Sequence, residues 1–534
     1  MKKTKLLLAL CFVSCMAHAQ IIYTVGGNGT AGFSGDGGPS PSAEVHSGTL
    51  LSGMAMDASG NFYFADTQNN RVRMITPSGV ISTVVGNGTA GYTGDGGQAS
   101  AAELHGPTSV AFDASGNMYI ADAANNAVRE VNTSNVISTI AGTGVAGYSG
   151  NGGSAVSAKL NNPTGVCVDG SGNIYVADYN NNVIRVITSG TISLFAGSGA
   201  SYQNNAAATS TIIQGASSVK YHNGYIYYND LGEFVIRLVK ISSGIVNSIN
   251  INPIYFFWDI SVDNSGNVYT YGDISGTSNH VIAKIAVNLT TFNGTVTSYV
   301  GNGTAGFSGD GGAPTSAEIG STITGLCNNS SGDLYFFDYV NARIRVVSAN
   351  CPAMAGPGEL NQQDDCGLWT PGVTIGTPGV SGMTYSWGPN TNLSSTTIAQ
   401  PTSTYSTTLS HQSINYTVTV SGTGCTTSTS TVNVVARKNT CIGCCRMAEG
   451  IDAKNQTTTA FGVYPNPATE QVTISLYDKA EYIRITDMQS RLVFETKNID
   501  AQDFKLDISK YNKGIYFINA KMGDKIEKQK LVVE

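Results

Sequence analysis

The sequence predicts an all-β fold: a six-bladed β-propeller closed by its N-terminal strand and followed by two small β-sandwich domains. A ten-residue sequence motif recurs at Asp57–Asp66, Asp113–Asp122 and Asp169–Asp178, with a constant spacing of 56 residues. Such a period marks a repeat architecture. Each full repeat also contains four short runs of β-branched and aromatic residues with turn residues between them, which is the content of one propeller blade.

The strands of one blade are clearest in the second repeat, at 109–112, 117–121, 127–131 and 137–141. The segment Asp-x-Ser-Gly-Asn joins the first two strands of a repeat. Its Asp and Ser side chains accept hydrogen bonds from their own turn, while its Gly permits a positive φ. We therefore predict that the first aspartate of each segment caps a turn, the alternative being a metal ligand; these residues are Asp57, Asp113 and Asp169.

The N-terminal strand closes the predicted ring. The inner strand of a repeat is found six times, and so is the outer strand, but one outer strand, 22–25, precedes the first inner strand. The last repeat ends at 344–347 without an outer strand of its own. We expect strand 22–25 to complete that last blade, because closure of this kind removes an exposed sheet edge.

The composition and the N-terminus indicate an exported protein. The net charge is −7 and only 12% of the residues are charged, so there is no basic surface to hold a nucleic acid. Three lysines precede an apolar run at 6–13 and a small-residue cleavage site, which predicts a signal peptide at 1–19. No later apolar stretch approaches the roughly 18 residues that a membrane helix needs. We predict no membrane span.

The cysteines are too sparse to form a disulfide framework. Cys167 and Cys327 occupy the same position of two repeats, where other repeats have alanine, and we expect both to be buried and free. In the segment after the propeller, Cys425 is expected to pair with Cys366, and Cys351 is the alternative partner.

The fragment Asn-Asn-Arg-Val-Arg at 69–73 recurs with small changes at 125–129, 181–185 and 341–345. It resembles the NHL repeat. The resemblance covers roughly residues 21–350, strongly in four of the six units, within a propeller predicted at residues 20–350. The resemblance implies that the repeated arginines are structural and pair from blade to blade with the repeated aspartates. The alternative is that these arginines face a ligand.

Four glycine-rich loops connect repeats, at 27–38, 86–97, 142–153 and 301–312. They lack the lysine and the helix that a phosphate-binding loop needs. Each loop carries one aromatic residue that we expect to be a buried anchor, the alternative being a platform for a sugar ring; these residues are Phe33, Tyr92, Tyr148 and Phe307. Three loops carry a candidate calcium ligand, namely Asp36, Asp95 and Asp310.

The repeats lose their regularity in the fourth and fifth units, where the loops shorten and aromatic residues gather. The candidate ligand-binding residues are Tyr255, Phe257, Trp258, Tyr221 and Tyr225. Because aromatic faces stack on sugars and on peptide side chains, we predict a cleft over these two blades that binds a carbohydrate or a protein partner. The alternative is that these side chains fill a bulkier core.

A metal-dependent propeller enzyme is the competing interpretation. His46 and His105 occupy equivalent positions just before inner strands, and they are candidate metal ligands. Two histidines are too few for the three-ligand site of a catalytic zinc ion, so we predict no catalytic residue and no required cofactor, with calcium or zinc left open. The alternative function is that of a lyase or lactonase with a metal in the central channel.

The composition changes after the propeller. Residues 351–436 are rich in Thr, Ser and Gly, and they resemble the Ig-like or PKD-like domains of bacterial surface proteins. Residues 437–460 are typical of a linker. We expect their clustered cysteines to form a local disulfide or to stay free, because the alternative, a zinc site, needs a fourth ligand that the neighbouring sequence does not supply.

Residues 461–534 form the last predicted domain. Motifs near Tyr464, Leu506, Lys513 and Lys530 resemble, in order and spacing, the type IX secretion C-terminal sorting domain of Bacteroidota. The resemblance assigns the sorting signal to Pro465, Asn466, Pro467, Gly514, Tyr516 and Lys530. It implies that the type IX secretion machinery carries the protein across the outer membrane. We therefore predict a secreted or cell-surface binding or scaffold protein.

Overall fold

The computed structural model describes most of the propeller and parts of the two later modules. The described residues are 20–48, 51, 53–251, 259–272, 280–354, 360–363, 373–403, 411–422, 425–438, 461–464, 471–476, 480–487, 491–499, 503–522 and 525–533. The chain divides into two compact units, Met1–Cys444 and Cys445–Glu534. Among the described residues, no helix is long and apolar enough to cross a membrane.

Six antiparallel sheets occupy the described residues between 21 and 348, and we number them in chain order of their inner strands. Sheet 1 holds β2 (Met54–Met56), β3 (Phe62–Asp66), β4 (Arg71–Ile75) and β5 (Ile81–Val85). Sheet 2 holds β6 (Pro107–Phe112), β7 (Met118–Asp122), β8 (Ala127–Val131) and β9 (Ile137–Ala141). Sheet 3 holds β10 (Gly153–Ser154), β11 (Pro163–Val168), β12 (Ile174–Asp178), β13 (Val183–Thr188) and β14 (Thr191–Gly197).

The remaining three sheets follow the same order of strands. Sheet 4 holds β15 (Ala206–Ala207), β16 (Val219–His222), β17 (Tyr225–Asp230), β18 (Val235–Lys240) and β19 (Ile245–Ile249). Sheet 5 holds β20 (Ile260–Val262), β21 (Val268–Gly272), β22 (His280–Asn288) and β23 (Asn293–Gly303). Sheet 6 holds β24 (Ile323–Asn328), β25 (Leu334–Asp338), β26 (Arg343–Ser348) and β1 (Ile21–Gly26).

Short 3-10 helices lie in two kinds of connection. Five of them follow the loops between sheets: η1 (Ser40–Ser42), η3 (Ala99–Ala101), η5 (Ala155–Ser157), η7 (Ala208–Ser210) and η8 (Pro314–Ser316). Three join the second and third strands of a sheet: η2 (Thr67–Asn69), η4 (Ala123–Asn125) and η6 (Tyr179–Asn181).

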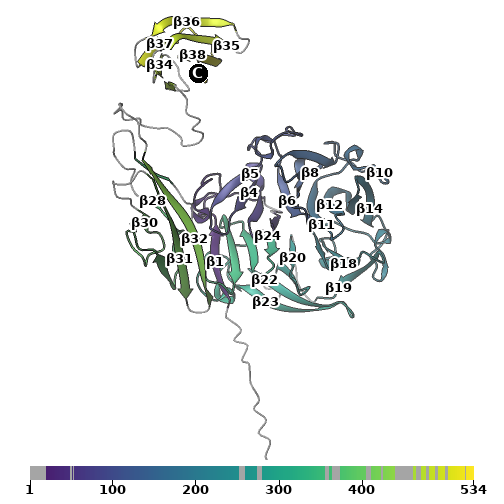
Figure 1. Cartoon of the computed structure of the whole chain (residues 1–534). Coiled ribbons are helices and arrows are strands. Elements are labelled where there is room, and N and C mark those ends of the chain that lie inside the picture. The colour runs from purple at the N-terminus through teal and green to yellow at the C-terminus, as the bar shows by residue number, and fades with distance from the viewer. Residues whose placement is uncertain are drawn as a thin grey trace, which may run out of the picture. The chain divides into compact units, whose positions relative to one another are not determined.

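The inner strands of the six sheets form a closed ring. Each inner strand contacts the inner strand of the next sheet, and β24 of the last sheet contacts β2 of the first. The sheets are therefore the blades of a β-propeller, as Figure 1 shows. The inner strands approach closely at Gly53, whose amide donates to the Thr108 carbonyl at 2.7 Å. A Cβ at Gly53 would lie 2.6 Å from the Ser109 backbone, so a larger residue would force the strands apart.

The N-terminal strand closes the ring, which confirms the prediction. β1 pairs antiparallel with β26, and Ile22 lies opposite Val347. The glycine-rich loop that precedes sheet 6 contacts the other edge of β1, where the Ile22 amide donates to the Gly312 carbonyl at 3.1 Å. The first and last strands of the propeller are therefore joined in one sheet.

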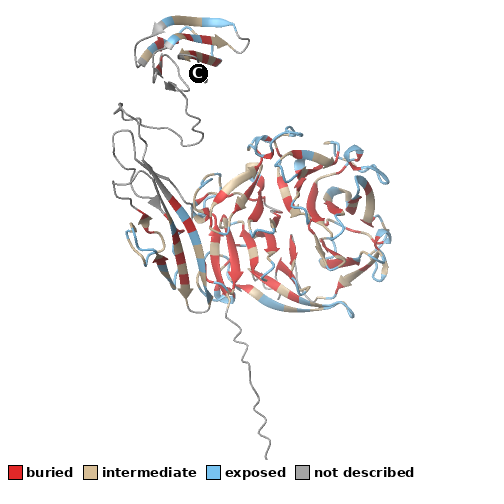
Figure 2. Cartoon of the chain, in the orientation of Figure 1, coloured by how far each residue is buried: buried red, intermediate tan, exposed pale blue. Residues whose placement is uncertain are grey.

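The hydrophobic core is divided into layers between neighbouring sheets. Phe62 and Phe64 of β3 pack into the layer between sheets 6 and 1, whereas Tyr63 and Ala65 of the same strand pack into the layer between sheets 1 and 2. Successive side chains of a strand point to opposite faces, so each blade supplies two layers. Figure 2 shows this burial along the strands and the exposure of the connecting loops.

The two propeller cysteines are buried and free, as expected. Cys167 belongs to the layer between sheets 3 and 4, and Cys327 belongs to the layer between sheets 6 and 1. Burial raises the pKa of both thiols well above the ordinary value, to about 11 for Cys327. Both are therefore present as uncharged core side chains at neutral pH.

The module after the propeller contains a four-stranded sheet and a two-stranded sheet. Their strands are β27 (Leu360–Gln363), β28 (Val373–Thr374), β29 (Met383–Gly388), β30 (Thr402–Ser403), β31 (His411–Gly422) and β32 (Cys425–Lys438). Trp387 and Tyr416 are buried in its core. Cys425 is bonded to Cys351, the alternative partner, at an S–S distance of 2.09 Å. Cys366, the first choice, lies outside the described residues.

The second unit is a small two-sheet sandwich. One sheet holds β33 (Phe461–Tyr464), β34 (Gln471–Leu476) and β37 (Asp503–Asp507). The other holds β35 (Ala480–Asp487), β36 (Leu492–Ile499), β38 (Gly514–Met522) and β39 (Lys525–Val533). Ile474 of the first sheet and Ile518 of the second are fully buried in one shared core.

Candidate functional site

The propeller has two chemically different faces. Strands in a sheet are antiparallel, so the connections alternate between the two ends of the strands. The turns after the first and third strands lie at one end, which we call the turn face. The turn after the second strand and the long loop to the next sheet lie at the other end, which we call the loop face.

The repeated aspartates of the turn face cap turns, as predicted. One carboxylate oxygen of Asp57 accepts from the amides of Ser59 at 2.8 Å and Asn61 at 2.9 Å. The other oxygen accepts from the Asn61 side chain at 2.8 Å and the Tyr63 hydroxyl at 3.0 Å. Burial opposes ionisation, but these hydrogen bonds outweigh it and lower the pKa of Asp57 below its ordinary value. Asp113 and Asp169 make the same set of contacts.

On the loop face, a fully buried arginine lies between two aspartates. Arg73 donates to Asp36 of the preceding glycine-rich loop at 2.7 Å, and its guanidinium lies 3.7 Å from Asp66. It also donates to the carbonyls of Ser34 and Glu44, at 2.8 and 2.7 Å. The guanidinium therefore ties the loop to the sheet.

The same arrangement recurs in other sheets and corrects one expectation. Arg129 contacts Asp95 at 2.6 Å and Asp122 at 3.1 Å, and Arg345 contacts Asp310 at 2.7 Å. The arginine and the strand aspartate lie on neighbouring strands of one sheet, β7 and β8 for example, so the expected pairing from blade to blade is wrong. The candidate calcium ligands Asp36, Asp95 and Asp310 are all engaged by these guanidinium groups.

At the position of the candidate metal ligands His46 and His105, the backbone amide and not the side chain makes the repeated hydrogen bond. Their amides donate to Asp66 at 2.7 Å and to Asp122 at 2.8 Å. Asn161 occupies the same place in sheet 3 and donates in the same way. The position thus needs an N–H group and not an imidazole, which explains why its side chain varies. In the described part of the chain, no three His, Cys, Asp or Glu side chains are grouped as a metal site would need.

Burial raises the pKa of the strand aspartates. It moves the pKa of Asp66 and that of Asp178 from about 3.8 to about 6, although hydrogen bonds and the nearby arginine oppose the change. The pKa of Asp122, Asp230 and Asp338 is raised for the same reason. The folded state therefore takes up protons between pH 6 and 4, where the unfolded chain does not.

We expect the propeller to be more stable at pH 5 than at pH 7.5, by a few degrees in the midpoint of thermal unfolding. A folded-state pKa above the unfolded value favours folding at low pH, and this contribution is lost as the pH rises through 6. Thermal denaturation at the two pH values measures the effect, and the D178N variant should show a smaller difference because it removes one titrating group. An equal or lower midpoint at pH 5 in the unaltered protein would contradict the prediction.

The aromatic residues of the glycine-rich loops are exposed rather than buried, which corrects the preferred expectation. The exposed fractions are 39% for Phe33, 38% for Tyr92, 46% for Tyr148 and 40% for Phe307. Each ring lies over an arginine: the distance to the guanidinium carbon is 5.2 Å for Tyr92 over Arg129 and 4.9 Å for Tyr148 over Arg185. The rings therefore cover the buried guanidinium groups and keep part of their surface in solvent.

One further aromatic residue that lies over an arginine was not predicted from the sequence. Tyr202 lies over Arg237 of sheet 4 at 5.2 Å, although its loop lacks the glycine-rich motif. What Tyr202 shares with the other four residues is its distance from the following 3-10 helix, which starts six residues later, against seven for the other loops. This relation needed the helix positions to be known.

Two of the candidate ligand-binding residues line one pocket of about 370 Å³ on the turn face. Tyr221 and Tyr225 flank the turn between β16 and β17 of sheet 4. Asp169 and its turn in sheet 3 form the opposite wall, and Lys240 and Ile241 come from the turn between β18 and β19. The other candidates, Tyr255, Phe257 and Trp258, lie outside the described residues.

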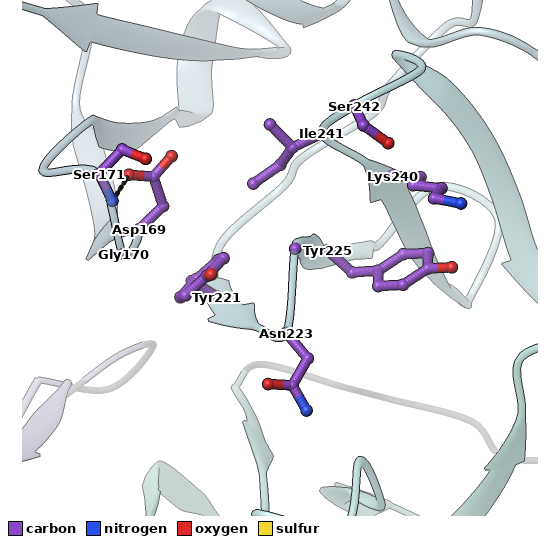
Figure 3. A pocket seen from close by; sticks show the side chains of 10 residues that line it. Asp169, Gly170, Ser171, Tyr221, Asn223, Tyr225, Lys240, Ile241 and Ser242 are labelled. Carbon is purple, nitrogen blue, oxygen red and sulfur yellow. Dashed lines mark hydrogen bonds between the residues drawn. The ribbon is translucent and has the colours of Figure 1, made fainter.

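The pocket combines aromatic surface with polar groups. Figure 3 shows the Tyr221 ring between the Asp169 turn and Tyr225, while Tyr225 and Lys240 point away from Asp169. Both tyrosines are half-buried and Lys240 is exposed. The Asp169 carboxylate is already saturated by four donors of its own turn and strand. The pocket thus offers the Tyr221 ring and the polar groups of the surrounding turns to a small polar ligand.

The residues assigned to the sorting signal lie in the second unit. Gly514 starts β38, Tyr516 is buried and donates from its hydroxyl to the Asn512 carbonyl at 2.9 Å, and Lys530 pairs with Phe517 across β38 and β39. Pro465, Asn466 and Pro467 lie outside the described residues.

Comparison with protein families identifies two of the modules. Residues 462–534 match the secretion system C-terminal sorting domain. Residues 160–187 match the NHL repeat, and residues 87–148 match the Teneurin NHL domain. The sorting domain shows that the protein is secreted to the cell surface by type IX secretion.

Individual relatives are distant. The chain is 28% identical to Teneurin-3 of Mus musculus over 287 residues, which is 47% of this chain and 10% of Teneurin-3. The chain thus spans a tenth of that relative's length. Among solved structures, it is similar to an auxiliary nutrient binding protein from Bacteroides thetaiotaomicron VPI-5482, with 15% identity, a TM-score of 0.43, and coverage of 62% of this chain and 76% of that one. It is also similar to a gluconolactonase from Xanthomonas campestris, with 11% identity, a TM-score of 0.39 and coverage of 57% and 88%.

Proposed function

We propose that this protein is a secreted binding protein whose propeller holds a carbohydrate or a protein segment in the pocket at Tyr221 and Tyr225. The observation that carries the proposal is the meeting of two tyrosines with a turn of the neighbouring sheet around a space of about 370 Å³. That volume falls within the range of about 300–1,000 Å³ that ligand pockets have. The C-terminal sorting domain supports the proposal, because it delivers the propeller to the cell surface, where such ligands are met.

The composition of the pocket favours a sugar as the ligand. A sugar ring presents C–H groups on its faces and hydroxyl groups around its edge, so it needs a flat aromatic surface beside polar partners. Tyr221 supplies the aromatic surface, and Tyr225 lines the pocket beside it. Asn223, Ser171 and Ser242 supply amide and hydroxyl groups at the rim. Lys240 adds one positive charge that an acidic group of the ligand would meet.

The scaffold holds the two tyrosines in fixed positions. Tyr221 packs against the core layer between sheets 3 and 4, and Tyr225 packs against the layer between sheets 4 and 5. The Tyr225 ring also lies 6.4 Å from the buried Tyr227. Side chains that are ordered before binding lose little entropy when a ligand arrives.

We expect the Y221A variant to bind its glycan ligand about tenfold more weakly, because one stacking surface is lost. Glycan-array screening of the full chain identifies the ligand, and isothermal titration with that glycan measures the change. The Y221F variant keeps the ring and should bind nearly as the unaltered protein does. Tyr179 is half-buried on the loop face, so Y179A is the matched control for loss of a tyrosine. Equal binding by Y221A, Y225A and Y179A, all folded, would refute the proposal.

A further inference from the structure

The loop face carries a repeated set of exposed rings that the pocket on the turn face does not use. We call Phe33, Tyr92, Tyr148, Tyr202 and Phe307 the loop aromatics. They belong to the loops that precede sheets 1, 2, 3, 4 and 6, which are contiguous around the ring. Four of them are among the large hydrophobic residues that are exposed in the described part of the chain. What sets these rings apart is that exposure recurs at one equivalent position of successive loops.

The surroundings hold each ring in place before any ligand binds. The buried arginine lies on the protein side of the ring, as with Arg129 under Tyr92 at 5.2 Å. The Tyr92 hydroxyl lies 3.2 Å from the hydroxyl of Thr139, and the Tyr148 hydroxyl accepts from the Asn151 side chain at 2.8 Å. The next loop also approaches Tyr92 closely, because a Cβ at Gly144 would lie 3.1 Å from the ring. The rings are therefore preorganised surfaces.

The rings are isolated from one another by polar loops. Each is embedded in a segment of Gly, Ser, Thr and Asn, such as the one around Tyr92. A protein interface generally has a contiguous apolar centre that excludes water, and single rings in polar loops do not provide one. Single flat rings with polar groups beside them suit sugar units, each of which needs one stacking surface and several hydrogen-bond partners.

The accessible charges beside the rings are of both signs. The exposed Lys159 lies against Gly147, one residue before Tyr148, and the half-buried Arg71 lies over the Phe33 ring at 3.5 Å. The Asp95 side chain is 49% exposed, whereas its partner Arg129 is completely buried. Glu103 is half-buried with its carboxylate against Gly91, one residue before Tyr92, and Glu44 is placed in the same way against Gly32. Charges of both signs beside the rings and a net charge of −7 on the chain favour a neutral ligand over an acidic polymer, and the hydroxyl groups of a neutral sugar can donate to these carboxylates.

We propose that the loop face binds a neutral polysaccharide, with loop aromatics of neighbouring sheets stacking on separate sugar units of one chain. A ligand built of identical units matches a protein surface built of identical sites, and simultaneous contacts add avidity. The proposal does not depend on the pocket at Tyr221 and Tyr225, which lies on the opposite face.

Affinity electrophoresis of the full chain tests the proposal. Native gels contain laminarin, galactomannan, xyloglucan or starch as neutral polymers, and polygalacturonate as the acidic one. We expect at least one neutral polymer to retard the protein, and polygalacturonate not to do so. Each of Y92A and Y148A should raise the apparent dissociation constant several-fold, and the double variant should raise it by at least tenfold.

Controls separate loss of the ring from loss of the fold. Y92L and Y148L keep apolar cover over the arginines without an aromatic face, and they should bind as poorly as the alanine variants, whereas Y92F and Y148F should bind normally. V340A removes another exposed apolar side chain, from a turn of the same face, and should have no effect. Absence of retardation by every neutral polymer, or equal retardation of the folded leucine double variant, would overturn the proposal. Y221A should leave this binding unchanged, so failure here and failure of the pocket are distinguishable.

Discussion

Replacing Arg129 with methionine is expected to lower the free energy of unfolding by about 3–5 kcal/mol at pH 7.5, the cost of breaking a buried ion pair. The Arg129 side chain is completely buried and contacts Asp122, which is also completely buried, at 3.1 Å. Methionine fills much of the same space but leaves the Asp122 carboxylate without its cation. Chemical denaturation of the full chain, followed at the propeller transition, measures the loss.

Two controls show whether the ion pair causes the loss. The R129M/D122N double variant carries no buried charge at this site and should recover part of the stability. The effect of R129M should also be smaller at pH 5, because burial raises the pKa of Asp122 and the carboxyl group can become neutral. If R129M lowers the stability equally at both pH values and D122N recovers nothing, lost packing and not charge would be the cause.

The second large effect concerns the closing strand. Ile22 of β1 is completely buried in the layer between sheets 5 and 6. We expect I22D to destabilise the propeller by more than about 4 kcal/mol, because it places an unpaired carboxylate in an apolar core. Loss of β1 also exposes the edge of β26, so the amides of Val346 and Ser348, which face Tyr23 and Ile21 of β1, should exchange with deuterium much faster than in the unaltered protein.

Ser138 provides the matched control for this experiment. It is exposed on β9, the outer strand of sheet 2, so S138D adds the same charge to an outer strand without burying it. I22V should cost only about 1 kcal/mol, because it removes one methyl group from the same place. Unchanged exchange at β26 in I22D would show that β1 is not needed to hold the ring closed.

The repeat period and the turn chemistry were sufficient to predict the propeller. The turn that begins at Asp57 has the composition of a capped turn. In so short a turn the Asp57 carboxylate can reach mainly donors of the turn itself and of the strand that follows it. The closing role of β1 also followed from the sequence, because one outer strand lacked a blade and one blade lacked an outer strand. These features are local or follow from the order of the strands.

The partners of the arginines could not be predicted in the same way. Arg73 and Asp36 are both repeated features of the sequence, but they meet only because the glycine-rich loop folds back over the sheet that follows it. The same folding carries Phe33 and its equivalents to the surface above the arginines and not into the core. The sequence argument was that a buried ring would offset the entropy lost when the loop is ordered. In the structure, the contact between each ring and a guanidinium group holds the loop instead.

The sequence could predict one wall of the pocket but not the other. Tyr221 and Tyr225 flank one turn, so their proximity was implied by the hairpin. The turn at Asp169 comes from the preceding blade, and nothing in its sequence marks it as the opposite wall of a pocket. The disulfide partner of Cys425 was equally hard to predict. Cys351 lies just after β26, and the Cys351 amide donates to the Thr426 carbonyl, which brings the two cysteines together.

The sequence by itself determined the repeat, the four strands of a blade, the closure by β1 and the sorting domain, since these depend on turn residues and on alternation along the chain. Only the tertiary structure decided which side chains meet: Arg73 with Asp36, the loop aromatics with their arginines, and Tyr221 with the Asp169 turn. The reason is physical. A contact within a turn or a strand pair is set by spacing, whereas a contact between a loop and a sheet, or between two blades, is set by how closely packed surfaces fit.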